Sequence, residues 1–216
     1  MTRLQTGLLA VVSPVLLTIG CALNKAEQGA IIGAGAGGAA GAVVGHATGS
    51  TVRGAIIGAV VGGAAGAIIG HQMDKQAEEL AYELPGATVQ RIGEGIAVTF
   101  PDGVLFGFDS DQLMPAAREN MRKFAASLAK YTDTRTVIVG HTDSQGSDQY
   151  NMDLSTRRAE STASFIAAEG VDRARLGTAG RGEAEPIATN GTDAGRQQNR
   201  RVEVAIYADD AARRAQ

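Results

Sequence analysis

A carboxylate and a guanidinium, Asp143 and Arg158, stand fifteen residues apart in the C-terminal half of this 216-residue chain. Asp143 follows a short apolar run that predicts a strand, and Arg158 lies near the start of an expected helix. The loop between them contains Gly146 and can fold back, so that both side chains face one pocket. Arg158 can hold a carboxylate with two parallel hydrogen bonds. An isolated Asp and Arg pair is more often a surface ion pair worth less than about 1 kcal/mol, so spacing alone leaves both interpretations open.

Catalysis is the less favoured chemistry for these residues. His141 and Asp143 are two positions apart on an extended segment, without a Ser or Cys nucleophile that they could orient. Ser144 and Ser147 lack the strand-turn-helix setting of a nucleophile elbow. The single cysteine, Cys21, excludes an intramolecular disulfide framework and a cysteine-based zinc cluster. We therefore expect no enzyme activity, no cofactor and no metal site.

The elements that must position Asp143 and Arg158 follow from periodicity. An apolar helix face is formed by Ala117, Met121, Phe124 and Leu128, with Pro115 near its start. A second expected helix has Ala159, Thr162, Ala163 and Ile166 on one side and stops at Gly170. Strands are predicted at 96–100, 104–108, 136–139, 176–180 and 202–206, with a turn at 101–103. This order predicts an α+β sandwich with helices on one face of a mixed sheet, spanning residues 96–208 and followed by a tail at 209–216.

The glycine content is concentrated in a duplicated segment. Residues 29–71 hold 14 of the 29 glycines, and residues 29–46 and 54–71 are identical at 14 of 18 positions with a period of 25. Glycine recurs at every fourth position in each unit, which aligns the glycines on one helix face and lets two backbones approach closely. The segment resembles the glycine-zipper region of several outer-membrane lipoproteins.

Helices of this composition are unfavourable in water, because each interior glycine costs about 1 kcal/mol relative to alanine. In a bilayer, unpaired backbone groups cost several kcal/mol each, and eighteen residues would span about 27 Å. We therefore expect an antiparallel helical hairpin that turns at residues 47–53; a flexible tether is the alternative. His46 and His71 end the two units and are read as interfacial caps. A charged connector, expected to be helical from Gln72 to Glu83, lies within a linker at 72–95.

The N-terminus predicts export. Arg3 precedes a short apolar run that ends at Gly20, and Pro14 lies within it, so residues 1–20 fit a secretory signal better than a membrane span. Cys21 directly follows and resembles the lipobox cysteine of bacterial lipoproteins, although Thr18 and Ile19 depart from the preferred residues. The resemblance implies acylation of Cys21, a lipidated tether at 21–28 and sorting to the outer membrane.

Four ordered motif blocks carry a second resemblance. They read Phe106-Gly-Phe108-Asp109-Ser110-Asp111; Gly140-His-Thr142-Asp143-x-x-Gly146-x-x-x-Tyr150-Asn151-x-x-Leu154-Ser155-x-x-Arg158-Ala159; Gly180-x-Gly182-Glu183-x-x-Pro186-Ile187-Ala188-x-Asn190; and Gly195-Arg196-x-x-Asn199-Arg200-Arg201-Val202-Glu203. Over roughly residues 104–207 the chain resembles the C-terminal domain of the OmpA family, shared with peptidoglycan-associated lipoproteins and flagellar stator subunits.

That resemblance implies non-covalent binding of peptidoglycan through meso-diaminopimelate in its stem peptide, without catalysis. Diaminopimelate presents a carboxylate and an ammonium, so Arg158 would bind the former and Asp143 the latter. Asn151 would orient the ligand as both donor and acceptor. Thr142 lies in the same motif block, and Arg201 resembles a further ligand contact of the family.

These observations give a main hypothesis and an alternative. The main one is a lipid-anchored outer-membrane protein with its C-terminal domain in the periplasm, bound to the cell wall. The alternative makes the glycine zipper primary, as a self-associating membrane element that forms an oligomer or pore, with the OmpA-like domain as an accessory anchor. A peptidoglycan hydrolase and a stator subunit are disfavoured. Residues 72–216 carry 17 basic and 22 acidic side chains, which argues against a nucleic-acid partner.

Overall fold

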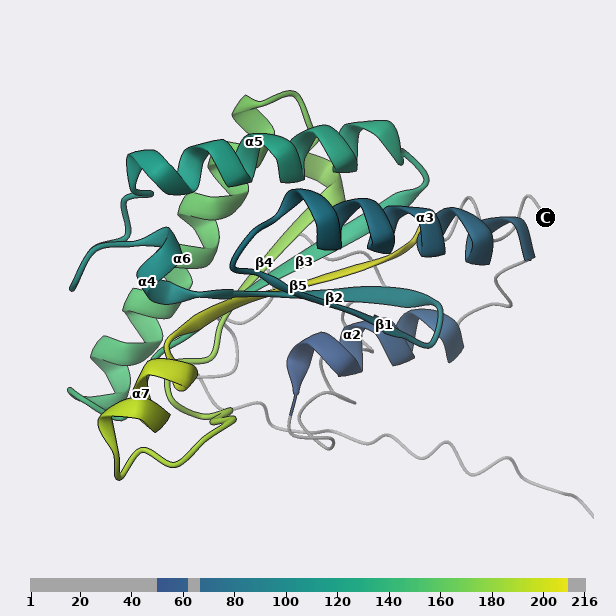
Figure 1. Cartoon of the computed structure of the whole chain (residues 1–216). Helices are drawn as coiled ribbons and strands as arrows, with labels where there is room; N and C mark the ends of the chain where they lie inside the picture. Colours follow the sequence, from purple (N-terminus) through teal and green to yellow (C-terminus); the bar gives the residue numbers. More distant parts are fainter. Residues whose placement is uncertain (1–49, 62–66, 210–216) are drawn as a thin grey trace, which may run out of the picture.

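The computed structural model describes residues 50–61 and 67–209. A five-stranded mixed sheet, in the order β1-β2-β5-β3-β4, forms its centre. The strands are β1 (Thr88–Ile92), β2 (Gly95–Pro101), β3 (Thr134–His141), β4 (Leu176–Gly180) and β5 (Arg201–Ala208). The helices are α2 (Thr51–Val61), α3 (Ala67–Glu83), α4 (Asp102–Leu105), α5 (Pro115–Lys130), α6 (Asp148–Ala168) and α7 (Asp193–Asn199), with a 3-10 turn at Arg173–Arg175. The predicted α+β class with a mixed sheet is confirmed (Figure 1).

Pairing within the sheet explains its mixed character. β3 and β4 are parallel and are joined through α6, whereas β1 with β2, β2 with β5, and β5 with β3 are antiparallel. Because β5 is the last strand yet lies between β2 and β3, it closes the sheet from the C-terminal end of the chain. The N-terminal ends of β5 and α6 and the C-terminal end of β3 are consequently brought together by this topology.

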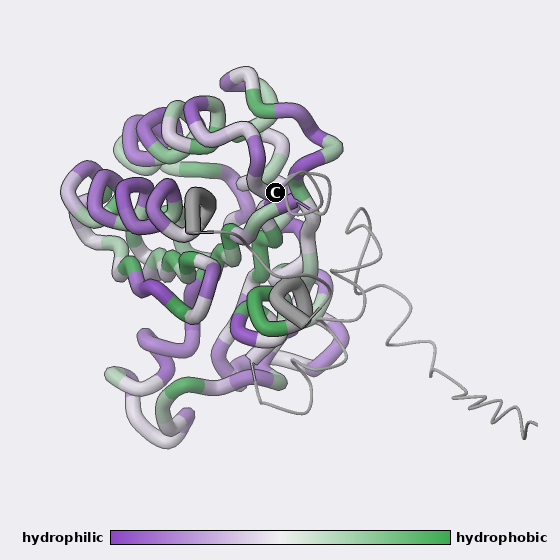
Figure 2. Tube along the Cα trace, turned by 90° about the vertical axis from the view of Figure 1, so that its right-hand side faces the viewer, coloured by the Kyte–Doolittle hydropathy of each residue, from purple (hydrophilic) through white to green (hydrophobic). Residues whose placement is uncertain are grey.

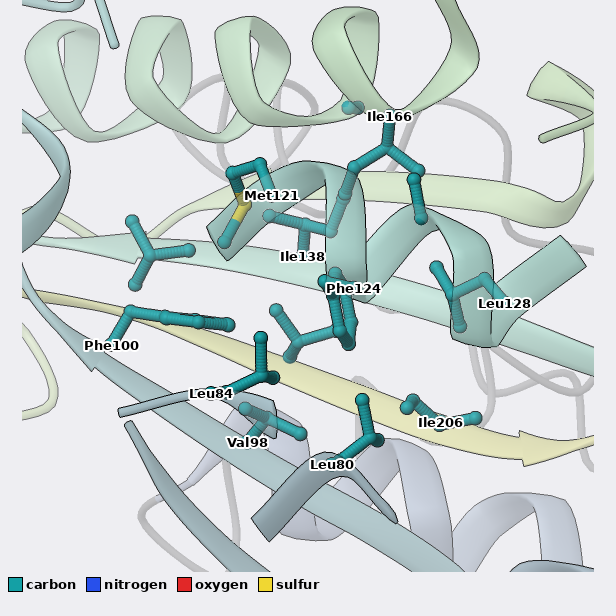
Figure 3. Close-up of a cluster of buried hydrophobic side chains, with 14 of the residues drawn as sticks. Leu80, Leu84, Val98, Phe100, Met121, Phe124, Leu128, Ile138, Ile166 and Ile206 are labelled. Atoms are coloured by element: carbon teal, nitrogen blue, oxygen red, sulfur yellow. The ribbon is translucent and has the colours of Figure 1, made fainter. Parts of the chain in front are cut away.

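One face of the sheet carries the main core. Large side chains from α3, α5 and α6 meet the strands there, as Figure 3 shows for Leu80, Phe100, Phe124, Ile138 and Ile166. The rings of Phe100 and Phe124 pack edge to face with centroids 5.7 Å apart. The expected faces of both long helices are buried, which confirms the periodicity argument. The hydropathy colouring of Figure 2 shows hydrophobic segments inside the fold and hydrophilic turns of the helices outside.

Two glycines let α6 approach the sheet closely. A Cβ at Gly140 on β3 would overlap the backbone carbonyl of Ser155, and one at Gly180 on β4 would overlap the hydroxyl of Thr156. Gly140, a member of the second motif block, serves this close packing of a helix on a strand and not a turn. Gly146 and Gly182 do turn the chain, with φ values of +110° and +50°.

The other face of the sheet is covered by α2, which precedes the span 96–208 for which helices on one face were predicted. Val52, Ala55 and Ile56 of α2 are buried against small apolar side chains of the strands: Ala97, Val137, Val139, Ala179 and Ala205. Figure 1 shows α2 on the side of the sheet opposite α3 and α5. Its position is physically reasonable because the apolar side chains of α2 pack closely on a strand face of mostly small apolar residues.

The structure also differs from the hairpin that was predicted for the glycine segment. Helix α2 starts at Thr51, so residues 51–53, expected in the turn, are helical. The second repeat contributes to two helices, α2 and the beginning of α3, on either side of residues 62–66, which are not described. The first repeat at 29–46, the signal at 1–20 and Cys21 lie outside the described residues. None of the helices in the described ranges is both long enough and apolar enough to cross a membrane.

Residues 72–95, expected as a linker, belong to the folded domain. Met73, Ala77, Leu80 and Leu84 recur at helical spacing along and just after α3, and all four are buried in the main core. Gln76 is buried too, and its Nε2 donates to the hydroxyl of Ser127 on α5 over 3.3 Å. β1 then adds an edge strand beside β2. The folded unit in the described residues therefore begins well before residue 96.

The expected strand at 104–108 is wrong. Residues 102–105 form α4, a single helical turn, and Phe106 makes only an isolated bridge to Leu113. The reason is that both edges of β2 are already paired, with β1 and with β5, so a hairpin partner following Pro101 has no edge to join. The turn instead buries Leu105 and Asp102, and Asp102 becomes available to a neighbouring helix.

Candidate functional site

Asp143 lies in the loop that leaves β3. Its Oδ1 accepts a hydrogen bond from the backbone N–H of Gln145 over 2.9 Å, an Asx-turn that fixes the carboxylate. Its Oδ2 is bonded to Nη1 of Arg200, and the side chain is 6% exposed. Gly146 then turns the chain, and Ser147 caps α6 by accepting from the N–H of Tyr150. The carboxylate is thus held in place from its own loop and from the residue before β5.

Arg158 lies on the buried side of α6 and meets a partner that the sequence analysis missed. Its Nη2 is 3.1 Å from Oδ2 of Asp102, and its Nε donates to the carbonyl of Ser110 over 2.9 Å. The guanidinium also lies over the ring of Phe106, 5.2 Å from its centroid. The Arg158 side chain is only 3% exposed, so its charge depends on these neighbours.

The two ion pairs form one cluster, which we call the four-charge cluster: Asp102, Asp143, Arg158 and Arg200. The backbone N–H of Asp102 donates to the carbonyl of Arg200 over 3.0 Å, which joins the pairs through the main chain. Burial raises the pKa of Asp102 to about 6, while the charges of Arg158 and Arg200 act in the opposite direction. Burial also lowers the pKa of Arg158, opposed by Asp102 and Asp109.

Asn151 connects the cluster to the loop after β4. Its Nδ2 donates to the backbone carbonyl of Asp143 over 3.2 Å and to Oε2 of Glu183 over 2.7 Å. In the same region the N–H of Thr142 donates to the carbonyl of Gly182 over 2.8 Å. The Thr142 hydroxyl is buried and has no hydrogen-bond partner among the described residues. The structure therefore brings Asp143, Asn151, Thr142 and Arg158 into one region, as predicted, and adds Glu183.

Arg201 is not brought to this cluster. Alternate residues of β5, Val202 and Val204, face the main core, whereas Ala205 faces α2. Arg201 precedes Ala205 by four residues on β5, so its side chain lies on the same face, the one that α2 covers. There it donates to Oε1 of Glu203 over 2.6 Å and to the carbonyl of Glu185 over 3.0 Å. Its neighbour Arg200, which precedes the strand, is the residue that reaches Asp143.

His141 is paired in register with Arg201 and is fully enclosed. Neither of its ring nitrogens has a hydrogen-bond partner among the described residues. Burial, and then the charges of Arg201 and Arg181, lower its pKa well below the usual value, so the ring is neutral. Within residues 50–61 and 67–209, no group of three or more His, Cys, Asp or Glu side chains is arranged to hold a metal ion.

The cluster is chemically suited to a small zwitterion. Two carboxylates and two guanidiniums form two adjoining ion pairs in a largely buried setting, where charge-assisted hydrogen bonds are stronger than at the surface. Arg200 is the most exposed member, with 37% of its side chain accessible, so it is the member that a ligand reaches first. Two of the four residues were missed by the sequence analysis. Arg200 belongs to the fourth motif block, whereas Asp102 lies in the predicted turn at 101–103.

The fold and this cluster define a protein of the OmpA family, and comparison with known proteins agrees. The OmpA family model matches residues 105–200, and the YMGG-like Gly-zipper model matches residues 1–74. The chain belongs to the OmpA family. It is similar to the probable lipoprotein YiaD of Escherichia coli strain K12, with 39% identity over 207 residues, covering 91% of this chain and 94% of that protein.

Two further similarities concern the C-terminal domain. The peptidoglycan-binding protein ArfA of Mycobacterium tuberculosis is 40% identical over 103 residues, 48% of this chain and 32% of that protein. Among solved structures, the cell wall anchor of the T6SS from Pseudomonas aeruginosa matches with a TM-score of 0.57 and 28% identity, covering 62% of this chain and 97% of that chain. The similarity to YiaD thus spans nearly the whole chain, while these two cover 48% and 62% of it.

Proposed function

We propose that this protein is a non-enzymatic anchor to the cell wall, an outer-membrane lipoprotein whose periplasmic domain binds the diaminopimelate of peptidoglycan at the four-charge cluster. The observation that carries the proposal is the cluster itself, two adjoining ion pairs held at the ends of β3 and β5 and on α6. The printed names of ArfA, as a peptidoglycan-binding protein, and of the T6SS cell wall anchor support it.

Binding proceeds by exchange of partners. Asp143 is already bonded to the guanidinium of Arg200, and the ligand ammonium replaces that guanidinium at Oδ2. Arg200, released toward solvent, then joins Arg158 in holding the ligand carboxylate. The buried charges stay paired throughout, which avoids the cost of leaving a carboxylate unpaired. Glu183 adds a second acceptor for the ammonium beside Asn151. Each charge-assisted hydrogen bond contributes about 1.5–3 kcal/mol, enough together for a micromolar site.

The test is a sedimentation assay on purified sacculi with the full chain in detergent. Asp143→Asn keeps the shape of the side chain but removes its charge, and we expect at least about a tenfold loss of affinity. Arg157→Met is the matched control, because Arg157 is the half-exposed neighbour of Arg158 and pairs with Asp111 at the surface. Equal binding by Asp143→Asn and the wild type would refute the proposed site.

The lipid anchor is a separate part of the proposal. It rests on Cys21 directly after the apolar N-terminal run and on the name of YiaD as a probable lipoprotein. Labelling with radioactive palmitate should modify the wild type and leave Cys21→Ala unlabelled. Label that persists in the variant would show that this cysteine is not the acylated residue.

A further inference from the structure

The start of α2 is fastened to the loop after β4 by a group that we call the Thr51 clasp: Thr51, Arg181 and Glu185. The backbone N–H of Thr51 donates to Oε2 of Glu185 over 3.0 Å, and its hydroxyl donates to Oε1 over 2.5 Å. The same hydroxyl accepts from Nε of Arg181 over 2.6 Å, and Arg181 lies 3.2 Å from Glu185. A carboxylate at a helix N-terminus is favourable, and this one is 8% exposed.

The loop that holds this clasp also forms one side of the four-charge cluster. Gly182 lies between Arg181 and Glu185. Its carbonyl accepts a hydrogen bond from the N–H of Thr142, and the N–H of Gly182 donates to the hydroxyl of Ser155. Glu183 accepts from Asn151, which in turn contacts the backbone of Asp143. The two ends of a single five-residue loop therefore contact α2 while its middle contacts the cluster side, and a shift of the loop moves both.

We propose that Thr51, through Glu185 and the loop 181–185, is a positioning residue for peptidoglycan binding, so that docking of α2 and binding of ligand favour one another. The proposal rests on the proposed function of the cluster. With α2 docked, the loop is fixed at Arg181 and Glu185, and Glu183 stays where it holds Asn151 beside Asp143. With α2 released, Arg181 and Glu185 lose the hydroxyl between them and the loop gains freedom that the ligand must remove.

The two glycine repeats are not equivalent in this role. At the period of 25, Thr51 and Val52, which stand just before the second repeat, correspond to Ala26 and Glu27, which stand just before the first. Alanine has no hydroxyl for the clasp, and glutamate at the position of Val52 would place a charge against the buried strand face. Although the repeats themselves are nearly identical, only the second is preceded by side chains that fit the clasp and the strand face. Docking to the domain is therefore a property of the second repeat.

The experiment measures affinity of the full chain in detergent for a disaccharide tetrapeptide that contains meso-diaminopimelate, by calorimetry. Thr51→Val keeps the shape of the side chain and removes the hydroxyl; we expect affinity to fall about fivefold. Thr51→Ser keeps the hydroxyl and should bind within about twofold of the wild type. Arg53→Ala, at an exposed position on the same helix, is the control and should not change the affinity.

Reciprocity supplies the readout that a merely structural role would not change. If the sites are coupled, saturating muropeptide must slow hydrogen exchange of the α2 amides in the wild type, and this protection must disappear in Thr51→Val. If Thr51→Val binds with wild-type affinity and ligand does not protect α2, the coupling is overturned. Asp143→Asn then still tests the four-charge cluster independently. Failure of the wild type to bind the muropeptide would refute the proposed function and this inference with it.

Discussion

On one face of the sheet, Phe100 and Phe124 pack among leucines and isoleucines from three helices; on the other, Ala97, Val137 and Ala179 lie under α2. The first face gains its stability from large buried side chains. The second is a smaller apolar cluster, which includes the fully buried Ile56, and α2 is also held there by the Thr51 clasp. One sheet here thus supports a large core on one face and, on the other, a smaller cluster fastened by polar contacts at its edge.

The largest effect should come from the main-core face. Phe124→Ala removes a fully buried ring that packs on Phe100, and we expect the free energy of unfolding to fall by about 3–5 kcal/mol in urea denaturation followed by circular dichroism. Phe124→Leu should cost much less, because it leaves a smaller cavity. If Ile56→Ala on α2 proved equally costly for global unfolding, the distinction between the two faces would not stand.

The pH dependence of stability tests the role of the buried ion pair between Asp102 and Arg158 on the main-core face. The pKa of Asp102 is about 6 in the folded protein and has an ordinary value of 3.8, so between these values the folded form holds a proton that the unfolded form has lost. The contribution of Asp102 to stability is therefore fully present below about pH 4 and is lost as the pH rises through about 6. Relative to Asp102→Asn, the wild type should lose about 2–3 kcal/mol over that range. Parallel stability curves for the two proteins would contradict this assignment.

The smallest of the three effects concerns the α2 face. A Cβ at Gly95 would lie 2.7 Å from Cγ2 of Ile56 and 2.8 Å from the carbonyl of Ile206, so Gly95→Ala should displace α2 and cost about 1–3 kcal/mol. Hydrogen exchange should show faster opening of α2 than of the central strands. Gly103→Ala is the matched control, because a Cβ there meets nothing within 4 Å. Unchanged protection of the α2 amides in Gly95→Ala would show that the contact between Gly95 and Ile56 does not determine how firmly α2 is packed.

The same comparison explains what could be predicted from the sequence. The buried face of α5 followed from periodicity, because a helix that covers a sheet must repeat its apolar residues. A strand near β4 was also predicted, without a periodic pattern to support it. The position of α2 did not follow, since a helix of Gly, Ala and Ile suits a bilayer or a flat strand face equally well. Met73, Ala77 and Leu80 had the helical spacing that marks α3 as core, but the surrounding charges led to the interpretation as a linker.

The site was predictable only in part, for a related reason. Motif blocks identified Asp143, Asn151 and Arg158, which the fold does bring into one region. The partners of these residues depend on tertiary packing: Asp102 reaches Arg158 only because the expected second hairpin strand is a helical turn. Arg200 and Arg201 are adjacent in sequence but serve opposite sides of the sheet, which no spacing rule resolves before the pairing of β5 is known.

The Thr51 clasp also sets where mechanical load enters the domain. Tension that arrives along the chain from residues 1–49 reaches the described structure at the start of α2, where Thr51 is bonded to Glu185. There the load would divide between the loop 181–185 and the strands that α2 covers, β2, β3 and β5. In a protein held at its N-terminus and bound to a stiff polymer, part of the force would therefore pass from tether to ligand through one short loop.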